Sequence, residues 1–241
     1  MTFSIKHLSL LVFLLILFAS CSKDVNKKYY IIDGESVTIG TQEWMWKNLD
    51  VDRYRNGDTI PQVTDPKEWK KLTSGAWCYY DNDSAKGAIY GKLYNWYAVN
   101  DPRGLAPEGW HIASNEEWDI LVSYLQNNKE YWCNDNSNYI AKSLATVESW
   151  NSSTFTCSIG NNPDANNSTG FSALPGGYRS PNGLYFELRK ISFWWTSSEK
   201  NPSAAIHTNL VYNLRHIGNY YDYKEFGFSV RCVKNNPRYF R

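Results

Sequence analysis

An apolar run near the start of the chain most constrains where, and therefore how, the rest can fold. Residues 8–19 read LSLLVFLLILFA and follow Lys6 and His7. A helix needs roughly 20 apolar residues to span a bilayer, so this run is too short to do so. It matches the apolar core of an export signal. The alternative, a buried helix of the folded domain, is disfavoured because polar and charged sequence begins at Ser22.

The end of this run resembles a bacterial lipoprotein signal. Phe18-Ala19-Ser20-Cys21 is similar to the lipobox of lipoprotein signal peptidase, which implies cleavage before Cys21 and acylation of that cysteine. Each buried methylene of an acyl chain contributes ~0.8 kcal/mol to membrane binding. We therefore expect a signal peptide at residues 1–20, a lipid anchor on Cys21 and a flexible tether over residues 21–28.

The sequence after Cys21 bears on localisation. Ser22-Lys23-Asp24 resembles the short charged tag of Bacteroidetes lipoproteins that reach the cell surface. A plain solvated tether is the alternative interpretation. The prediction is a lipid-anchored outer-membrane protein that faces the cell surface.

Charge and aromatic content narrow the classes of partner. The chain has 25 Lys and Arg against 24 Asp and Glu, so it lacks the basic excess that phosphate binding requires, and we expect no nucleic-acid partner. It also has 11 Trp, 18 Tyr and 10 Phe. So many aromatic side chains fill a core and still leave some at the surface. We expect a monomer whose partners are the membrane, through Cys21, and a glycan or surface protein.

Four cysteines remain once Cys21 is lipidated. Export permits disulfides, and four cysteines allow three pairings. We expect Cys133 to pair with Cys157, closing a loop of about 25 residues. Cys78 and Cys232 would pair only if the fold brings them together.

Signals for metals are weak. No Cys-x-x-Cys motif occurs, and the three histidines after the signal show no metal-ligand spacing (His111, His207 and His216). Asp81-Asn82-Asp83-Ser84 clusters the oxygen ligands that calcium prefers, with a solvated loop as the alternative. We expect no metal and no cofactor.

Local patterns predict a few helices. Ser114-Asn115-Glu116-Glu117 is a capping box. One apolar stripe follows it at helical spacing: Trp118, Leu121, Val122 and Leu125. Asp65 before Pro66 predicts a short helix, and residues 140–144 predict another.

Other patterns predict strands and loops. Asp33-Gly34 predicts a hairpin between residues 29–32 and 36–39. Strands are expected within residues 43–49 and 76–80, a long loop over 151–169, and short strands with turns from 171 onward. For residues 90–99 the pattern leaves strand and helix open. We predict one α+β domain over residues 29–241.

Several blocks together resemble the Fibrobacter succinogenes major paralogous domain family. They include residues 44–49 (WMWKNL), 54–61 (YRNGDTIP), 91–99 (GKLYNWYAV), 107–111 (PEGWH), 170–179 (GFSALPGGYR), 194–199 (WWTSSE) and 227–233 (GFSVRCV). They run in the family's order from about residue 36 to 234, so the resemblance covers nearly all of the chain after the tether.

A looser resemblance concerns the fold. Residues 110–118, ahead of the amphipathic helix, and the closing strand with Cys232 are similar to the formylglycine-generating-enzyme branch of the C-type lectin-like fold. This implies small, twisted antiparallel sheets flanked by two helices, with long irregular loops. The chain departs from these families: Ala106 stands where a cysteine is common, and the reactive cysteine pair and the lectin calcium motifs are missing.

Candidate sites follow from the aromatic residues. No nucleophile motif such as Gly-x-Ser-x-Gly appears, so we expect no catalytic residues and no enzyme. Sugars present apolar faces to flat rings, and turn-rich sequence supplies four candidate ligand-binding rings: Tyr185, Tyr220, Tyr221 and Tyr223. Core packing is the alternative role.

Asp58-Thr59-Ile60 and Asp83-Ser84-Ala85 also resemble the acceptor triplet for Bacteroidetes O-glycosylation.

We predict a non-catalytic surface lipoprotein that binds glycans or other surface macromolecules, an adhesion module. The alternative is a structural lipoprotein subunit of a cell-envelope or fimbrial assembly.

Overall fold

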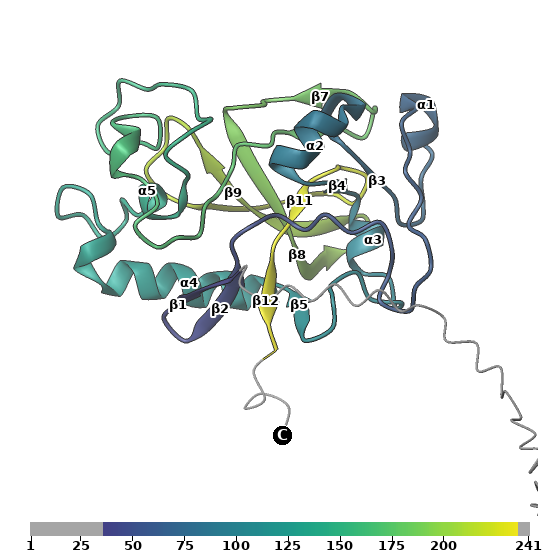
Figure 1. Ribbon diagram of the computed structural model, residues 1–241, viewed down its shortest axis with the longest axis horizontal. Coiled ribbons are helices and arrows are strands. Elements are labelled where there is room, and N and C mark those ends of the chain that lie inside the picture. Colours follow the sequence, from purple (N-terminus) through teal and green to yellow (C-terminus); the bar gives the residue numbers. More distant parts are fainter. Residues whose placement is uncertain (1–35, 236–241) are drawn as a thin grey trace, which may run out of the picture.

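The computed structural model describes residues 36–235 (Figure 1). The predictions of a signal peptide, a lipid anchor on Cys21 and a tether therefore concern positions outside the described residues. Within them the chain is of the α+β class, as predicted, and consists mostly of small sheets joined by loops and short helices.

The first sheet joins the two ends of the described chain. It contains β1 (Ser36–Ile39), β2 (Gln42–Met45), β12 (Cys232–Lys234) and β5 (Trp110–Ile112), in the order β1-β2-β12-β5, with every pair antiparallel. The hairpin β1–β2 turns at Gly40, whose φ of 61° favours glycine. The C-terminal strand β12 thus lies between the N-terminal hairpin and β5 (Figure 1).

The second sheet carries the longest strands. It contains β8 (Ile191–Asn201), β9 (Ala204–Val211), β10 (Gly218–Tyr223) and β11 (Ser229–Val230), in the order β10-β9-β8-β11. β11 runs parallel to β8, so the expectation of purely antiparallel sheets is wrong. Two further pairs complete the strands: β3 (Trp77–Cys78) with β4 (Leu93–Tyr94), and β6 (Tyr178–Arg179) with β7 (Tyr185–Phe186).

One helix is much longer than the others. α4 (Asn115–Asn127) begins at the predicted capping box: Ser114 Oγ accepts from Glu117 N, and the Glu117 carboxylate accepts from Ser114 N. The remaining helices are α1 (Pro66–Trp69), α2 (Ser84–Tyr90), α3 (Trp96–Val99), α5 (Ala141–Leu144) and three short 3₁₀ turns. The expectation of two flanking helices is therefore wrong for the described residues; one long helix and four short ones of four to seven residues replace them.

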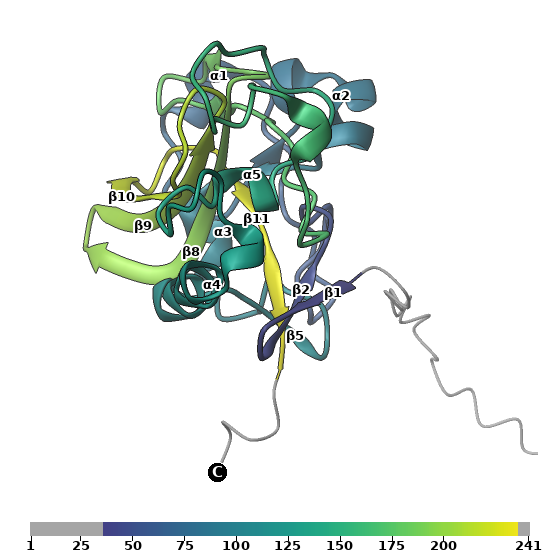
Figure 2. The same cartoon turned by 90° about the vertical axis from the view of Figure 1, so that its left-hand side faces the viewer.

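The second sheet is covered on both faces. α4 packs against β8 and β9 (Figure 2), and there the Trp118 and Trp194 rings lie 5.6 Å apart. On the opposite face Trp195 packs against Phe228, with ring centroids 4.4 Å apart. Trp194 and Trp195 are both fully buried, because alternate residues of a strand point to opposite faces.

A buried arginine links the two large sheets. Arg231 donates from one nitrogen to Met45 O (2.8 Å) and Phe171 O (2.7 Å), and from the other to Asn48 Oδ1 (3.0 Å). Asn48 also accepts from Trp194 Nε1 at 2.8 Å. Burial lowers the pKa of Arg231 to about 9, which still leaves the guanidinium charged at neutral pH.

The cysteines divide into a bonded pair and two free thiols. Cys133 and Cys157 form a disulfide, as predicted, with Cα atoms 5.7 Å apart. The pairing considered for Cys78 and Cys232 is wrong: both are free and buried, in different hydrophobic clusters. Burial raises the pKa of both thiols, that of Cys232 to about 12.

Several predicted strands are shorter than their sequence patterns. β2 ends at Met45, and the strand expected within 76–80 covers only Trp77 and Cys78. The ambiguous residues 90–99 contain the end of α2, all of β4 and all of α3. β1 pairs with β2, and its predicted partner, residues 29–32, lies outside the described residues.

The packing of α4 gives a test of this fold. Trp118 is buried while Ile120, on the same helix, is exposed. Trp118→Ala should lower the free energy of unfolding by ~3–5 kcal/mol, and Ser114→Ala by ~1 kcal/mol through loss of the cap. Urea unfolding measures both, with Ile120→Ala as the matched control. Equal losses for Trp118→Ala and Ile120→Ala would contradict the packing.

Candidate functional site

Three of the four predicted tyrosines lie on one edge strand. Tyr220, Tyr221 and Tyr223 belong to β10, at the outer edge of the second sheet (Figure 2), and are 57%, 58% and 61% exposed. The turn-rich sequence that was expected around them instead forms a strand, in which aromatic residues are favoured. The strand pleat sends Tyr220 to one face and the other two to the opposite face.

Tyr185 lies elsewhere. It belongs to β7, where its hydroxyl donates to Asn82 Oδ1 at 2.8 Å. The Arg179 guanidinium lies 5.0 Å from the centre of its ring. Burial raises the pKa of this phenol well above its usual value. Tyr185 is thus held in place by its neighbours, and the four predicted tyrosines do not form one surface.

The Tyr220 ring lies against Gly218 of the same strand. A Cβ at Gly218 would lie 2.7 Å from Cε2 of Tyr220 and 2.2 Å from Oδ1 of Asn209. The ring therefore occupies space that only glycine leaves open. Because Tyr220 stays more than half exposed in this position, it offers a ring to solvent beside the sheet.

Four further aromatic rings continue from Tyr220 along the same side of the sheet. The partly exposed members form a surface that we call the aromatic strip: Tyr178, Phe186, Phe193, Tyr220 and Phe226. Ring centroids lie 5.6 Å apart for Phe186 and Tyr178, 5.2 Å for Tyr178 and Phe193, and 5.8 Å for Tyr178 and Phe226.

His207 links this row to Tyr220. Its ring lies 5.2 Å from Phe193 and 6.2 Å from Tyr220, and is itself buried. The row of rings from β7 therefore reaches the edge strand through the buried ring of His207, although its members come from separate parts of the sequence.

Carboxylates accompany the aromatic strip. Asp222 shares the face of Tyr220 on β10, and its Oδ2 lies 3.0 Å from Nε2 of His207. Burial, followed by the negative charges of Glu187 and Asp222, raises the pKa of the Tyr178 phenol. The arrangement thus combines flat apolar rings with hydrogen-bond acceptors, which is the chemistry that a sugar needs: ring faces for its C–H face and oxygens for its hydroxyls.

Sequence reasoning missed Tyr178, Phe193 and Phe226. These residues approach Tyr220 only through the pairing of separate strands, so no local pattern connects them. One local signal was available: Gly218, Tyr220 and Asp222 alternate along β10, which places a ring and a carboxylate on one face beside a residue without a side chain.

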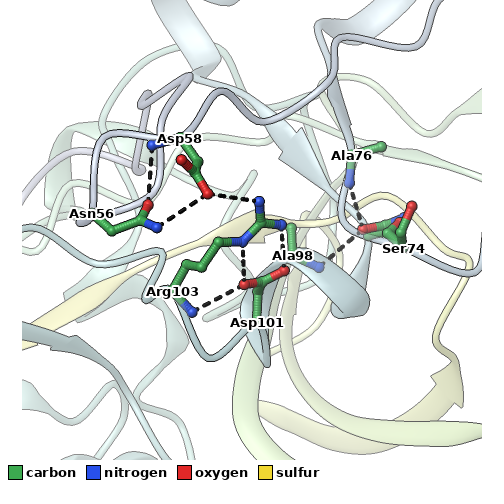
Figure 3. Close-up of polar contacts among 8 residues, drawn as sticks. Asn56, Asp58, Ser74, Ala76, Ala98, Asp101 and Arg103 are labelled. Carbon is green, nitrogen blue, oxygen red and sulfur yellow. Dashed lines mark hydrogen bonds and ion pairs between the residues drawn. The ribbon is translucent and has the colours of Figure 1, made fainter.

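A polar cluster on the loops before α1 and after α3 has a structural role (Figure 3). Arg103 bridges both oxygens of Asp101 at 2.8 Å, reaches Asp58 at 3.2 Å, and stacks 4.1 Å from the Tyr54 ring centre. Asn56 in turn caps Asp58. Hydrogen bonds from Arg103 lower the pKa of Asp101. The cluster connects the two loops, and its opposite charges pair with one another.

A groove of about 400 Å³ lies between residues 45–51 and helix α2. Its lining is mostly apolar and includes Trp46, Ile89 and Leu174. Asn48 is a polar residue of the lining, but its amide donates to Tyr90 O and Ser229 Oγ within the core. The groove therefore offers less directional chemistry than the aromatic strip.

The calcium candidate has other roles. Asp83 caps α2 by accepting from Ala85 N at 2.9 Å, and Asp81 forms an ion pair with Lys86. Within residues 36–235 no three His, Cys, Asp or Glu side chains converge as a metal site would require. The part of the chain that the structure describes also has no helix long and apolar enough to cross a bilayer.

The geometry defines an α+β domain with partly exposed aromatic rings along one face of its main sheet, as far as the edge strand β10. The chain belongs to the Fibrobacter succinogenes major domain family, whose model matches residues 37–234. This confirms the resemblance seen in the sequence blocks. It is a family of surface-associated domains without an assigned biochemical activity. No curated protein and no solved structure matches the chain.

The position of Tyr220 can be tested through Gly218. Gly218→Ala should displace the ring and lower the free energy of unfolding by ~1–3 kcal/mol, as overpacking does. In a Tyr220→Ala background the same change should cost less, because one of the two obstructing side chains is gone. Urea unfolding of the four proteins measures this coupling. Equal costs in both backgrounds would show that the ring does not lie over Gly218.

Proposed function

We propose that this chain is a non-catalytic, lipid-anchored surface protein that binds glycans through the aromatic strip. The observation that carries the proposal is the row of partly exposed rings that the buried His207 connects to Tyr220, with Asp222 beside it. A row of rings matches an extended chain of sugar units better than a single small ligand, because each ring offers one stacking face.

The exposure of these rings supports binding over core packing. Phe186 is 40% exposed and Tyr220 is 57% exposed, while Phe228, which packs against Tyr178, Phe193 and Phe226, is buried. The buried rings already fill the core. Contiguous exposed apolar surface on a soluble domain is typical of interaction sites.

The C-type lectin-like architecture is part of this proposal. It is supported by sequence similarity around residues 110–118 and by the α+β class of the chain. In such folds long loops next to a small sheet carry the ligand site, whereas the aromatic strip lies on strands. The proposal therefore takes the lectin-like resemblance as a statement about fold only.

One observation favours the alternative, a structural subunit of an envelope or fimbrial assembly. β10 is an edge strand of six residues, with Tyr221 and Tyr223 exposed on the face away from the aromatic strip. Edge strands present unpaired backbone groups that can pair with another chain. An assembly role predicts loss of oligomers, and not of glycan binding, when this face is changed.

The lipid anchor is tested separately from binding. Cys21→Ser should block acylation, because serine lacks the thiol that the lipid modifies. The variant should then fail to label with palmitate, and it should be either released or left as the unprocessed precursor. Labelling and membrane association equal to those of the parent protein would refute the anchor.

Glycan binding is tested at Tyr220, with Tyr223 as the matched control. We expect Tyr220→Ala to weaken binding roughly 2- to 10-fold, as for ~0.5–1.5 kcal/mol of lost stacking, without lowering the melting temperature. Tyr223→Ala removes an equally exposed tyrosine from the opposite face and should leave binding unchanged. A glycan array on the mature Cys21→Ser chain identifies the ligand, and calorimetry gives the affinities. No binding to any glycan would favour the structural subunit.

A further inference from the structure

The aromatic strip is flanked by negative charge. Asp222 lies at its β10 end, with its side chain 39% exposed, and Glu187 follows Phe186 at its other end. Both carboxylates act on the Tyr178 phenol between them and raise its pKa, after the larger effect of burial. A ligand on this surface therefore meets aromatic faces and carboxylates together.

His207 holds the Asp222 carboxylate in place. Its Nε2 faces Oδ2 of Asp222 at 3.0 Å, while its Nδ1 is buried and has no hydrogen-bond partner within the described chain. The ring is enclosed by Phe193, Trp195 and Phe228. The side chain of Asp222 stays 39% exposed, so its carboxylate also faces solvent.

The lysines around this surface are engaged elsewhere. Lys190 pairs with Glu187 at 3.3 Å, and Lys224 pairs with Glu199 and is nearly buried. Lys200 lies 5.4 Å from the Tyr221 ring, on the opposite face of β10. None of these three ammonium groups forms an ion pair with Asp222.

We infer that the Tyr220–Asp222 end of the aromatic strip binds the ammonium group of an amino sugar within the glycan. An exposed ring beside a partly exposed carboxylate attracts a cation in two ways, through the ring quadrupole and through charge. A neutral sugar would gain only the stacking contact and hydrogen bonds. This inference rests on the proposed function and specifies its ligand class: glycans with unacetylated amines.

The test compares two probes that differ in one group. The mature chain carrying Cys21→Ser is titrated, at about pH 6 and low salt, with a β-1,4-glucosamine hexamer and with its N-acetylated counterpart. We expect at least ~10-fold tighter binding of the free amine, and a smaller preference at high salt because exposed charges are screened. An oligolysine peptide of equal charge should compete poorly, since it lacks sugar faces.

Asp222→Asn should bring the preference for the free amine close to one. Glu108→Gln removes the same charge from the turn before β5 in the other sheet, and should leave the preference unchanged. If Asp222→Asn destabilises the protein, Tyr220→Leu decides, because it keeps apolar bulk but removes the aromatic face; it too should reduce the preference.

The outcomes separate this inference from the proposed function. Equal binding of both hexamers, unaffected by Asp222→Asn or Tyr220→Leu, would overturn the inference and leave glycan binding standing. Oligolysine binding as tight as that of the glucosamine hexamer would also overturn it, since the surface would then recognise positive charge alone. Binding to no glycan of either kind, on the hexamers or on the array, would overturn the proposed function itself.

Discussion

The buried guanidinium of Arg231 is the interaction on which the rest of the structure depends. It lies on the chain between β11 and β12, and reaches the carbonyls of Met45 and Phe171 and the amide of Asn48. It donates to carbonyl and amide oxygens. A buried charge compensated only by dipoles is costly if any partner is lost. Its contacts therefore fix the end of the chain against β2 and against the segment that leads to β6.

Asn48 extends this network into the second sheet. It accepts from Trp194 on β8 and donates to Tyr90 and Ser229, so one amide joins four segments that are distant in sequence. These bonds help to set the position of β8 relative to the first sheet. Trp194 then faces α4, and Trp195 faces Phe228. The sheet is buried on both sides at its centre and is exposed mainly along β10.

This arrangement explains why the aromatic strip lies where it does. Phe228 packs against Trp195, Phe193 and His207 at centroid distances of 4.4, 4.7 and 5.0 Å. Phe228 supports the rings that pack on it, so these rings have little room to rearrange. A supported and partly exposed row of rings loses little conformational freedom when a ligand binds, which favours affinity. The carboxylate of Asp222 is likewise held in place, by His207 beneath it.

The sequence by itself determined the features that depend on near neighbours. The capping box at Ser114, the apolar stripe through Trp118 and the proline-initiated helix at Pro66 each follow from contacts within a few residues. The family blocks determined the membership of residues 37–234. The predicted pairing of Cys133 with Cys157, which rested on export and on an even number of cysteines after Cys21, is also confirmed.

Only the tertiary structure decided the candidate site. Tyr178, Phe193 and Tyr220 come from three strands, and they meet because β10, β9 and β8 pair in one register while β6 lies beside them. The same register divides Tyr220 from Tyr221 and Tyr223, which sequence reasoning had grouped. The packing of the chain likewise places Cys78 and Cys232 in separate hydrophobic clusters. Strand pairing between distant segments is set by the packing of whole faces, and a local pattern of residues carries no record of which faces will meet.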